Sequence, residues 1–349
     1  MACKQLLNNL ILVFAIASGF AFGQGSTTSP QSNQNEPLVL AEQGSFFVGG
    51  ETLNRGPGDD VTINQMYVQY QVPVGDVGVP IVMTHGCCLS SKTWETTPDG
   101  RMGWDEYFVR QQHPVYLTDQ AGRARSGFDA TPFNETQAFE RFPDQQPAVN
   151  HASHQFSWSV FRFGEFGEPH AGLQFPIEAV DELYKQMIPD LNAGLPEMIP
   201  TWQGLATLAE DIGGAVLVGH SQSGLFPFHA ALLNPGAVAG IVSIEPGGTC
   251  HEDFGQTEDG DPSAQDIETL AGIPTLFIYG DYLEGTTWQD VYEDCRVLVD
   301  EINAAGGNAT MWHLPDLGIT GNSHMLMQDA NSLELADMLL AWVAENVDQ

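Results

Sequence analysis

The chain has 349 residues, 42% of them hydrophobic, so it can bury the core of one large α/β domain or of two small ones. It carries 11 Lys and Arg against 45 Asp and Glu, which gives a net charge of −34. Because phosphate contacts need basic side chains, this charge argues against nucleic acid or an anionic membrane surface as a partner. It predicts a solvated acidic surface and says nothing of the fold.

The first 23 residues have the pattern of a secretion signal. Lys4 supplies a positive start, and residues 10–22 form a nearly pure apolar run that is too short to span a membrane comfortably. Small residues then stand at the two positions that determine cleavage. We therefore expect a signal peptide over residues 1–23, a mature chain that begins near Gln24, and a secreted or periplasmic protein; an uncleaved membrane anchor is the alternative. Residues 24–36 are rich in Ser, Gln and Asn and are expected to form a disordered tether.

The mature chain alternates between strand patterns and helical patterns. Apolar strand patterns, the first two of which predict a hairpin, lie at residues 38–48, 61–72, 80–84, 115–118, 215–218, 237–244, 274–279 and 310–314. Helical patterns fall between most of them, as at residues 201–211, 287–304 and 333–346. This alternation predicts an α/β fold with a mostly parallel central sheet and helices on both faces. In such sheets the active site gathers beyond the carboxyl ends of the strands.

Residues from about 128 to 200 interrupt the alternation. The segment is rich in aromatic side chains, namely Phe133, Phe139, Phe142, Phe156, Trp158, Phe161, Phe163, Phe166 and Phe175. A segment of this length and composition predicts a cap over the strand ends. An ordinary helical crossover with a small core of its own is the alternative.

A serine stands where one strand pattern meets a helix-compatible run, in the turn Gly219-His220-Ser221. A serine hydroxyl is a weak nucleophile that needs a base and an exposed position, and a sharp strand-to-helix turn exposes it. The usual pattern is G-x-S-x-G, whereas here Ser223 occupies the place of the second glycine and Gly224 follows one step late. Ser221 is the candidate nucleophile, and a buried turn without a catalytic role is the alternative.

The candidate general base is His324, which follows the last strand pattern and precedes the final helix pattern. It stands downstream of the serine and of both candidate acids, in the order Ser, acid, His that is typical of this architecture. The chain has ten histidines, so the position of a histidine in the chain is stronger evidence for a catalytic role than its residue type. His220 is expected to pack inside the turn, and His85, His170 and His251 are less favoured pocket residues.

Two carboxylates compete as the partner of His324. Asp281 follows the strand pattern at residues 274–279, where most enzymes of this architecture place the acid. Glu245 closes the preceding strand pattern and is followed by Pro-Gly-Gly. A carboxylate that closes a buried strand is costly without a partner, and an imidazole N–H is a suitable one. The residues alone leave both alternatives open.

An oxyanion hole is expected from two backbone N–H groups. One belongs to Gln222, directly after the candidate nucleophile. The other belongs to Cys87, which follows His85-Gly86 at the end of an earlier strand pattern. Both would point at the negative charge that develops on the substrate oxygen, and removal of one such donor typically costs about a hundredfold or more in rate.

Together these motifs resemble the α/β-hydrolase superfamily and, more closely, its secreted bacterial esterase 713-like branch. The resemblance rests on His85-Gly86-Cys87-Cys88, on residues 119–126, on residues 219–224 and on residues 243–247. It implies an α/β-hydrolase domain over residues 37–349 with the insertion as a cap. It also implies carboxylic ester hydrolysis without a cofactor. That branch is similar in placing a glutamate at the end of the sixth strand as triad acid, which favours Glu245 over Asp281.

The expected reaction is hydrolysis of a small-molecule carboxylic ester through an acyl-enzyme on Ser221, with no metal. His324 would accept the serine proton, Glu245 would orient the imidazole, and the N–H groups of Cys87 and Gln222 would bind the oxyanion. A lactone, an amide or a polyester is an alternative substrate, and a catalytically silent secreted binding protein is an alternative of another class. The oligomeric state, with a homodimer as one alternative, stays open.

Export to an oxidising compartment would favour disulfides. Cys3 would leave with the signal, and the four remaining cysteines allow three pairings, which sequence alone cannot separate. We predict that Cys87 and Cys88 bond to each other and that Cys250 pairs with Cys295. Adjacent Cα atoms lie about 3.8 Å apart, below the usual disulfide range, so the first bridge would be strained. Free thiols at positions 87 and 88, or bridges from them to Cys250 and Cys295, are the alternatives.

Overall fold

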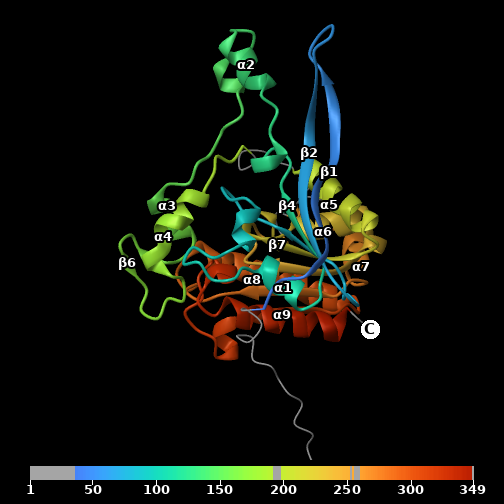
Figure 1. Cartoon of the computed structure of the whole chain (residues 1–349). Helices are drawn as coiled ribbons and strands as arrows, with labels where there is room; N and C mark the ends of the chain where they lie inside the picture. The colour runs from blue at the N-terminus through green and yellow to red at the C-terminus, as the bar shows by residue number, and fades with distance from the viewer. Residues whose placement is uncertain (1–35, 192–197, 252–253, 255–259, 348–349) are drawn as a thin grey trace, which may run out of the picture. The chain divides into compact units, whose positions relative to one another are not determined.

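The computed structural model describes residues 36–191, 198–251, 254 and 260–347 (Figure 1). The predicted signal peptide, and all but the last residue of the predicted tether, lie outside these residues. Residues 37–349 form one compact unit. Within the described part of the chain, no helix combines the length and the apolar character needed to cross a membrane.

Eight strands form the main sheet, in the order β1-β2-β4-β3-β7-β8-β9-β10. Their bounds are Leu40–Asn54 (β1), Asp60–Pro73 (β2), Ile81–Thr84 (β3), Val115–Asp119 (β4), Ala215–His220 (β7), Val238–Ile244 (β8), Thr275–Tyr279 (β9) and Ala309–His313 (β10). The pairs β1–β2 and β2–β4 are antiparallel, and all other neighbours are parallel. The predicted fold class, a mostly parallel sheet that opens with a hairpin, is confirmed.

Helices cover both faces of this sheet. Successive side chains along a strand point to opposite faces, and they pack into two different buried clusters. Ile81 and Met83 of β3 belong to one buried cluster, while Val82 between them belongs to another. The first cluster includes residues of α1 (Trp104–Arg110) and α9 (Ser332–Asn346). The second includes residues of α5 (Ile199–Asp211), α6 (Phe226–Leu233), α7 (Ala264–Leu270) and α8 (Thr287–Ala304). Strands buried on both faces read as continuous apolar runs, as these do.

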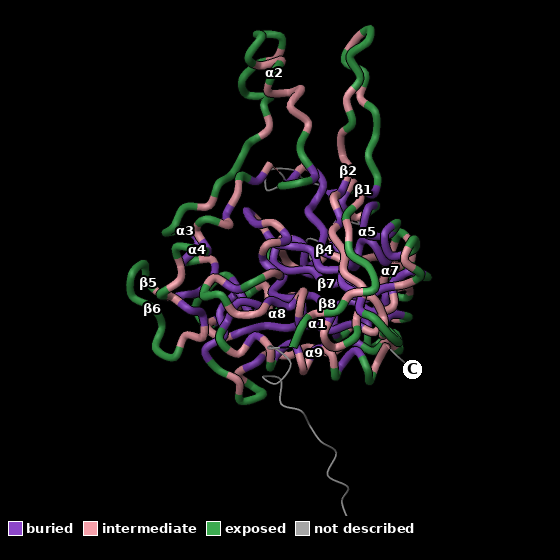
Figure 2. Tube along the Cα trace, in the orientation of Figure 1, coloured by how far each residue is buried: buried purple, intermediate pink, exposed green. Residues whose placement is uncertain are grey.

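Burial is greatest in the central parallel strands. Every residue of β3, β7 and β9 is buried, whereas most of β1 is exposed. Figure 2 shows this contrast, with exposed backbone at the end of the β1–β2 hairpin and around α2 (Thr131–Gln137). The carboxyl ends of the buried strands therefore offer rigid positions for functional side chains.

The segment between β4 and α5 contains the short helices α2, α3 (His154–Val160) and α4 (Val180–Gln186), and the two-stranded ribbon of β5 (Gly164–Glu165) and β6 (Glu168–Pro169). Apart from the half-buried Phe133, its Phe and Trp side chains divide into two groups. The buried group, which joins the core cluster of α1 and α9, is Trp158, Phe161, Phe163 and Phe175. The exposed group is Phe128, Phe139, Phe142, Phe156 and Phe166. Only part of the segment therefore packs on the sheet domain through its aromatic residues.

A disulfide joins Cys250, in the loop after β8, to Cys295 in α8. This pairing is confirmed. Both cysteines are fully buried in the cluster of α5 and α8, so the bridge ties the loop that follows a central strand to a helix packed against the sheet.

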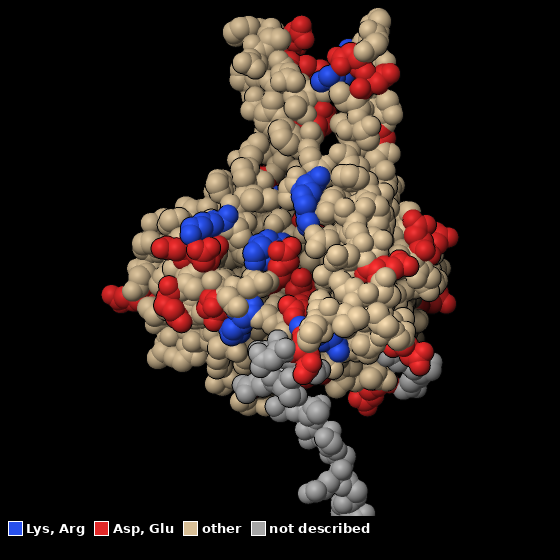
Figure 3. All heavy atoms as spheres, in the orientation of Figure 1, with Lys and Arg blue, Asp and Glu red and all other residues tan. Residues whose placement is uncertain are grey.

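The molecular surface is acidic, as the composition predicts. Figure 3 shows acidic side chains spread over the visible face, with basic side chains beside some of them. Exposed pairs of this kind, such as Arg296 with Glu293, contribute little to stability, typically about 0–1 kcal/mol. With 45 acidic and 11 basic residues, most carboxylates cannot have a Lys or Arg partner.

Candidate active site

Ser221 lies in the sharp turn that follows β7, with a φ angle of 56° and a side chain that is almost fully buried. Positive φ is uncommon for a residue with a Cβ and is typical of strained functional turns. Two glycines make the turn possible. A Cβ at Gly219 would overlap the carbonyl oxygen of Ser223, and a Cβ at Gly86 would lie 2.8 Å from the Cβ of Ser221. The turn therefore has the strand-to-helix geometry of a nucleophile elbow.

The departure from the G-x-S-x-G pattern has a structural reason. A Cβ at Gly224 would lie 2.5 Å from the Cα of Pro246, so the close approach falls one residue later than the pattern places it. Ser223 has a role of its own. Its hydroxyl accepts a hydrogen bond from the backbone N–H of His220 at 3.0 Å and donates to the carbonyl of Thr84 at 2.9 Å. The serine at this position thus ties the turn to the neighbouring strand.

Glu245 and His324 are in contact although 79 residues separate them. The Nδ1 atom of His324 lies 3.2 Å from Oε2 of Glu245, and both side chains are fully buried. Glu245 directly follows β8 with a φ angle of 48°, and its Oε1 accepts a hydrogen bond from the backbone N–H of Gly280. Because a carboxylate oxygen only accepts, Nδ1 carries the proton and Nε2 is the free base.

Asp281, the other candidate acid, has a different set of partners. Its two carboxylate oxygens accept hydrogen bonds from the backbone N–H groups of Gly321 at 2.8 Å and Tyr282 at 2.7 Å. Among the described residues, its side chain makes neither a hydrogen bond nor an ion pair with His324. The structure thus brings Glu245 and not Asp281 to the imidazole. That Glu245 acts as the triad acid stays a prediction.

Arg162 is the residue that the sequence reasoning missed. Its guanidinium, only 2% exposed, forms two hydrogen bonds to Glu245, at 2.8 Å from Nη1 and 2.5 Å from Nη2, and a third from Nε to the carbonyl of Asp281 at 2.8 Å. A charged residue between two aromatic ones, Phe161 and Phe163, was the available signal, because an arginine inside an apolar run is rarely buried unless it is paired.

The charges around Glu245 decide its ionisation. Burial alone would raise the pKa of this carboxyl, but the Arg162 charge and the hydrogen bonds from His324 and Arg162 lower the pKa to about 2. Burial, reinforced by Arg162 and opposed by Glu245, lowers the pKa of His324 below its usual 6.5. At neutral pH the pair is therefore an ionised carboxylate beside a neutral imidazole, the state that a general base requires.

Aromatic rings fix the position of the His324 imidazole. Trp288 lies with its ring 4.2 Å from the imidazole, and Phe161 stacks at 5.7 Å with an angle of 11° between the planes. The backbone N–H of His324 donates to the carbonyl of Phe161 at 3.0 Å, and Nε2 of His220 donates to the carbonyl of His324 at 2.9 Å. Within the described part of the chain, the Nε2 atom of His324 has no hydrogen-bond partner, so its lone pair is available.

The less favoured histidines lie elsewhere. His85 is buried and its Nδ1 lies 2.9 Å from the carbonyl of Gly86. His170 stacks on Tyr282 at 4.1 Å, and His251 pairs with acidic side chains near the disulfide. Among the described residues, none of these three lines the cavity at Ser221.

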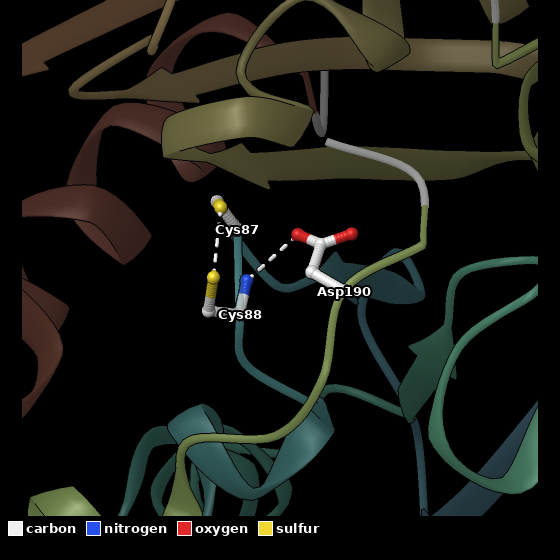
Figure 4. A group of neighbouring side chains, drawn as sticks. All are labelled: Cys87, Cys88 and Asp190. Carbon is white, nitrogen blue, oxygen red and sulfur yellow. Dashed lines mark hydrogen bonds between the residues drawn. The ribbon is translucent and has the colours of Figure 1, made fainter. Parts of the chain in front are cut away.

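Two backbone N–H groups near Ser221 stay unpaired. Among the described residues, neither the N–H of Cys87 nor that of Gln222 donates a hydrogen bond. Figure 4 shows how the loop that carries Cys87 is held, with the N–H of Cys88 donating to Oδ2 of Asp190 at 2.9 Å. Asp190 in turn forms a fully buried ion pair with Arg123. The two N–H groups that sequence reasoning assigned to the oxyanion hole are thus free to bind a ligand.

Comparisons with known proteins agree with this geometry. No protein-family model matches the chain. A bacterial esterase of known atomic-resolution structure is 41% identical, with a TM-score of 0.82, over 89% of this chain and 98% of that one. The chain belongs to the α/β-hydrolase superfamily. A probable secreted lipase, phiG, from a fungal species (strain ATCC 74256) is 26% identical over 85% of this chain and 88% of its own length. The resemblance expected from the motifs, including the bacterial esterase branch, is confirmed.

In this α/β-hydrolase the predicted Cys87–Cys88 disulfide is absent, which corrects the sequence-based prediction. Both are free thiols, with their Sγ atoms 3.1 Å apart. A bond would need about 2.05 Å, and the short spacing of adjacent Cα atoms opposes that geometry. The hydrogen bond to Cys88, together with burial, raises the pKa of the Cys87 thiol.

Cys87, Cys88 and Asp190 also bring three metal-ligating atoms within 4.8 Å of one another. Both carboxylate oxygens of Asp190 are already engaged, one by Arg123 and the other by the N–H of Cys88. The adjacent guanidinium opposes a cation. The carboxylate therefore serves the loop backbone rather than a metal.

A cavity of about 500 Å³ opens beside Ser221. Its lining is mostly apolar and comes from the segment between β4 and α5, from α5, α6 and α8, and from the loops after β3, β7 and β8. The lining residues are Cys87, Cys88, Ala152, Phe156, Val160, Phe161, Met187, Met198, Trp202, Ser221, Gln222, Leu225, Phe226, His229, Gly247, Gly248 and Trp288. An apolar cavity with one candidate nucleophile and two free N–H donors suits a small, mainly hydrophobic acyl compound.

Proposed function

We propose that this hydrolase is a secreted serine carboxylesterase that cleaves carboxylic esters through an acyl-enzyme on Ser221. The observation that carries the proposal is the buried contact between His324 and the ionised Glu245, with the His324 ring 4.8 Å from the ring of His220, which precedes Ser221 in the turn. Relatives named as an esterase and as a lipase support the same class of substrate.

In the proposed mechanism the contact between Glu245 and His324 is already formed, and the hydrogen bond from the Ser221 hydroxyl to Nε2 of His324 forms during the reaction. His324 Nε2 takes the proton of Ser221 as the hydroxyl attacks the ester carbonyl, and Glu245 stabilises the imidazolium through Nδ1–H. The N–H groups of Cys87 and Gln222 bind the oxyanion of the tetrahedral intermediate. The imidazolium then protonates the leaving alcohol. Water, activated by the same histidine, attacks the acyl-enzyme and releases the acid.

We also propose that residues 128–200 act as a cap over the active site. Phe156, Phe161 and Met187 of this segment line the cavity that Ser221 lines, which supports the assignment. A cap of this kind shields the acyl group from water and determines which acyl chains fit. Carboxylic esters of small molecules are the proposed substrates.

Export to the periplasm or the medium is part of the proposal, with residues 1–23 as the signal peptide. The relative from the fungal species is named as probably secreted. The Cys250–Cys295 bridge is of the kind that persists in oxidising compartments, which agrees with export.

A fluorophosphonate probe tests the proposed mechanism, since only an activated serine reacts with it. We expect stoichiometric labelling of the wild type, with the probe on the peptide that contains Ser221, and none of Ser221→Ala. Hydrolysis of p-nitrophenyl esters of increasing chain length, run in parallel, defines the acyl preference. A folded wild type that is unlabelled and inactive on every ester would overturn the proposal.

A further inference from the structure

The guanidinium of Arg123 joins the two chain segments that carry the candidate oxyanion donors. Arg123 lies in the loop after β4 and is only 1% exposed. Its Nη1 donates to the carbonyls of Gly86 and Leu89, both at 3.3 Å. Its Nη2 donates to Oε1 of Gln222 at 3.1 Å and to the carboxylate of Asp190. One buried charge therefore contacts both the loop after β3 and the turn of the candidate nucleophile.

The contact with Gly86 bears directly on one of the two donors. The carbonyl of Gly86 and the N–H of Cys87 belong to the same planar peptide group, so a bond that holds the carbonyl also fixes the direction of the N–H. A hydrogen bond from an ionised donor is stronger than a neutral one, and it polarises the peptide that accepts it. The Cys87 N–H is therefore both oriented and strengthened as a donor.

His85 supports the same carbonyl from the other side chain that reaches it. Burial and the charge of Arg123 lower the pKa of His85 to about 4, so its ring is neutral at neutral pH. Its Nε2 accepts a hydrogen bond from the backbone N–H of Gln120 at 3.2 Å. Nδ1 therefore carries the proton and donates to the carbonyl of Gly86 at 2.9 Å. Two side chains thus hold this peptide group.

The other candidate donor is held by backbone alone. The N–H of Gln222 shares a peptide group with the carbonyl of Ser221, which accepts from the N–H groups of Gly224 at 2.7 Å and Gly247 at 2.8 Å. Arg123 reaches Gln222 only through the side-chain oxygen. Loss of Arg123 should therefore disturb the N–H at position 87 more than the N–H at position 222.

Asp190 completes the arrangement from the inserted segment. One of its oxygens pairs with Arg123, and the other accepts the N–H of Cys88 at 2.9 Å (Figure 4). Cys88 has a φ angle of 59°, a conformation that is unfavourable for a residue with a Cβ and persists where the surroundings hold it. The buried ion pair thus holds the loop after β3 in an uncommon conformation.

We infer that Arg123 is a positioning residue for the oxyanion hole, because it orients the Gly86–Cys87 peptide so that the Cys87 N–H faces the developing negative charge. Its effect on turnover rests on the proposed function, whereas its effect on the peptide does not. Arg123 is absent from the described residues that line the cavity at Ser221, so it acts through the loop rather than by touching the substrate.

The first test observes the donor itself in the resting protein. Selective nitrogen-15 labelling of cysteine restricts the amide spectrum to five residues, among which the disulfide-bonded Cys250 and Cys295 serve as internal references. Cys87→Ser identifies the Cys87 signal by removing it. In Arg123→Lys the charge beside Asp190 is kept but the planar fork is lost. We expect the Cys87 amide to shift upfield while both reference signals stay in place.

The second test measures the consequence for turnover of p-nitrophenyl butyrate. Arg123→Lys should lower kcat about tenfold to a hundredfold, somewhat less than removal of a whole oxyanion donor. KM should change little, because the oxyanion forms only in the transition state. Arg123→Met combined with Asp190→Asn leaves no unpaired buried charge and keeps a side-chain oxygen for the Cys88 N–H. That double variant should show the same loss of kcat with little change in KM.

Arg125→Lys is the matched control. Arg125 follows two residues later and also pairs with a buried aspartate, Asp119, at 2.6 Å. Within the described part of the chain, its guanidinium donates to Asp119, Gln69 and Ser91, and to neither Gly86 nor Gln222. Arg125→Lys should therefore lower the melting temperature about as much as the lysine variant at position 123, while kcat stays within about twofold of the wild type.

The two readouts separate this inference from the proposed function. A Cys87 amide that stays in place in Arg123→Lys would overturn the positioning role, whether or not esters are hydrolysed. Equal losses of kcat in Arg123→Lys and Arg125→Lys would also overturn it, since the loss would then follow from stability alone. If the wild type hydrolyses no ester but the Cys87 amide still shifts, the esterase is refuted and the positioning of the peptide stands.

Discussion

The strand ends of the sheet and the segment between β4 and α5 contribute differently to the candidate site. Ser221 and Glu245 directly follow β7 and β8, and His324 lies in the loop beyond β10. Arg162 and Asp190 come from the segment outside the sheet, yet each forms a buried ion pair. The sheet thus supplies the candidate reacting groups, and the inserted segment supplies the charges around them.

This division makes the two regions sensitive to different changes. Groups at strand ends are held by the backbone ladder of the sheet, so a side-chain substitution there removes chemistry and leaves geometry. Removing Arg162 instead leaves Glu245 as an uncompensated buried charge, which is strongly destabilising in buried pairs. The inserted segment should therefore act on both the pKa values of the site and the stability of the fold.

The largest effect is expected at the strand end of β7. Ser221→Ala should lower kcat for ester hydrolysis by at least about a thousandfold, because only residual binding and oxyanion stabilisation remain. The far-UV circular dichroism and the melting temperature should stay close to those of the wild type. A variant that keeps more than about a thousandth of the rate would point to another nucleophile.

The second-largest effect should distinguish the two carboxylates that follow the neighbouring strands β8 and β9. Glu245→Gln should reduce kcat by about 10³–10⁴-fold, since the amide no longer stabilises the imidazolium. Asp281→Asn is the matched control, because the Asp281 carboxylate accepts hydrogen bonds from the backbone of Gly321 and Tyr282. Within the described part of the chain, this carboxylate makes no hydrogen bond or ion pair with His324. The kcat of Asp281→Asn should fall by less than about tenfold. The reverse ranking would move the acid to Asp281.

Sequence reasoning located the strand-end groups because each follows a recognisable pattern. The apolar run before Gly219 predicts a buried strand, and the order of serine, acid and histidine places His324. Residues alone left Glu245 and Asp281 equal, since both follow apolar strands. The resemblance favoured Glu245, and the structure shows which carboxylate meets the imidazole.

The inserted segment was less predictable for physical reasons. Arg162 pairs with a carboxylate 83 residues away, and such a contact leaves no periodic trace in the sequence. Asp190 lies 102 residues from Cys88, whose N–H it holds. The aromatic residues predicted a packed segment but did not indicate which rings are buried, because Phe163 and Phe166 look alike in sequence and differ in exposure.

A smaller effect tests the role of the inserted segment. Arg162 lowers the pKa of both Glu245 and His324, so Arg162→Met should raise the pKa of His324 and move the acidic limb of the kcat/KM profile to higher pH. The rate should fall most on the acid side of neutrality, where the histidine becomes protonated, and least near pH 8. Arg162→Lys keeps the charge and should shift the limb less.

The loss of stability caused by Arg162→Met should also depend on pH. The folded-state pKa of Glu245, about 2, lies below its ordinary 4.5. Its ionisation therefore contributes stability that is fully present above pH 4.5 and is lost as the pH falls toward 2. The difference in unfolding free energy between wild type and variant should thus be largest near neutral pH and shrink below pH 4. An unchanged pH–rate profile with a lower melting temperature would make Arg162 purely structural.

The smallest effect on turnover is expected from the disulfide, which joins the loop after β8 to α8 and so belongs to the sheet and its helices rather than to the inserted segment. Cys250→Ser with Cys295→Ser opens a loop with a sequence separation of 45 and should cost about 2–4 kcal/mol of stability, or roughly 4–8 °C in melting temperature. Cys295 lies two helical turns beyond Trp288, whose indole is separately held by the carbonyl of Val160, so the contact with His324 should persist. Values of kcat should stay within about twofold below the melting transition, measured on p-nitrophenyl esters.

Cys87→Ser with Cys88→Ser is the matched control. These thiols are not bonded, so that pair should leave the melting temperature nearly unchanged. A large loss of turnover in the Cys250 and Cys295 variant at low temperature would mean that the bridge positions the loop after Glu245. The geometry of the candidate site would then depend on the disulfide as well as on the strands of the sheet.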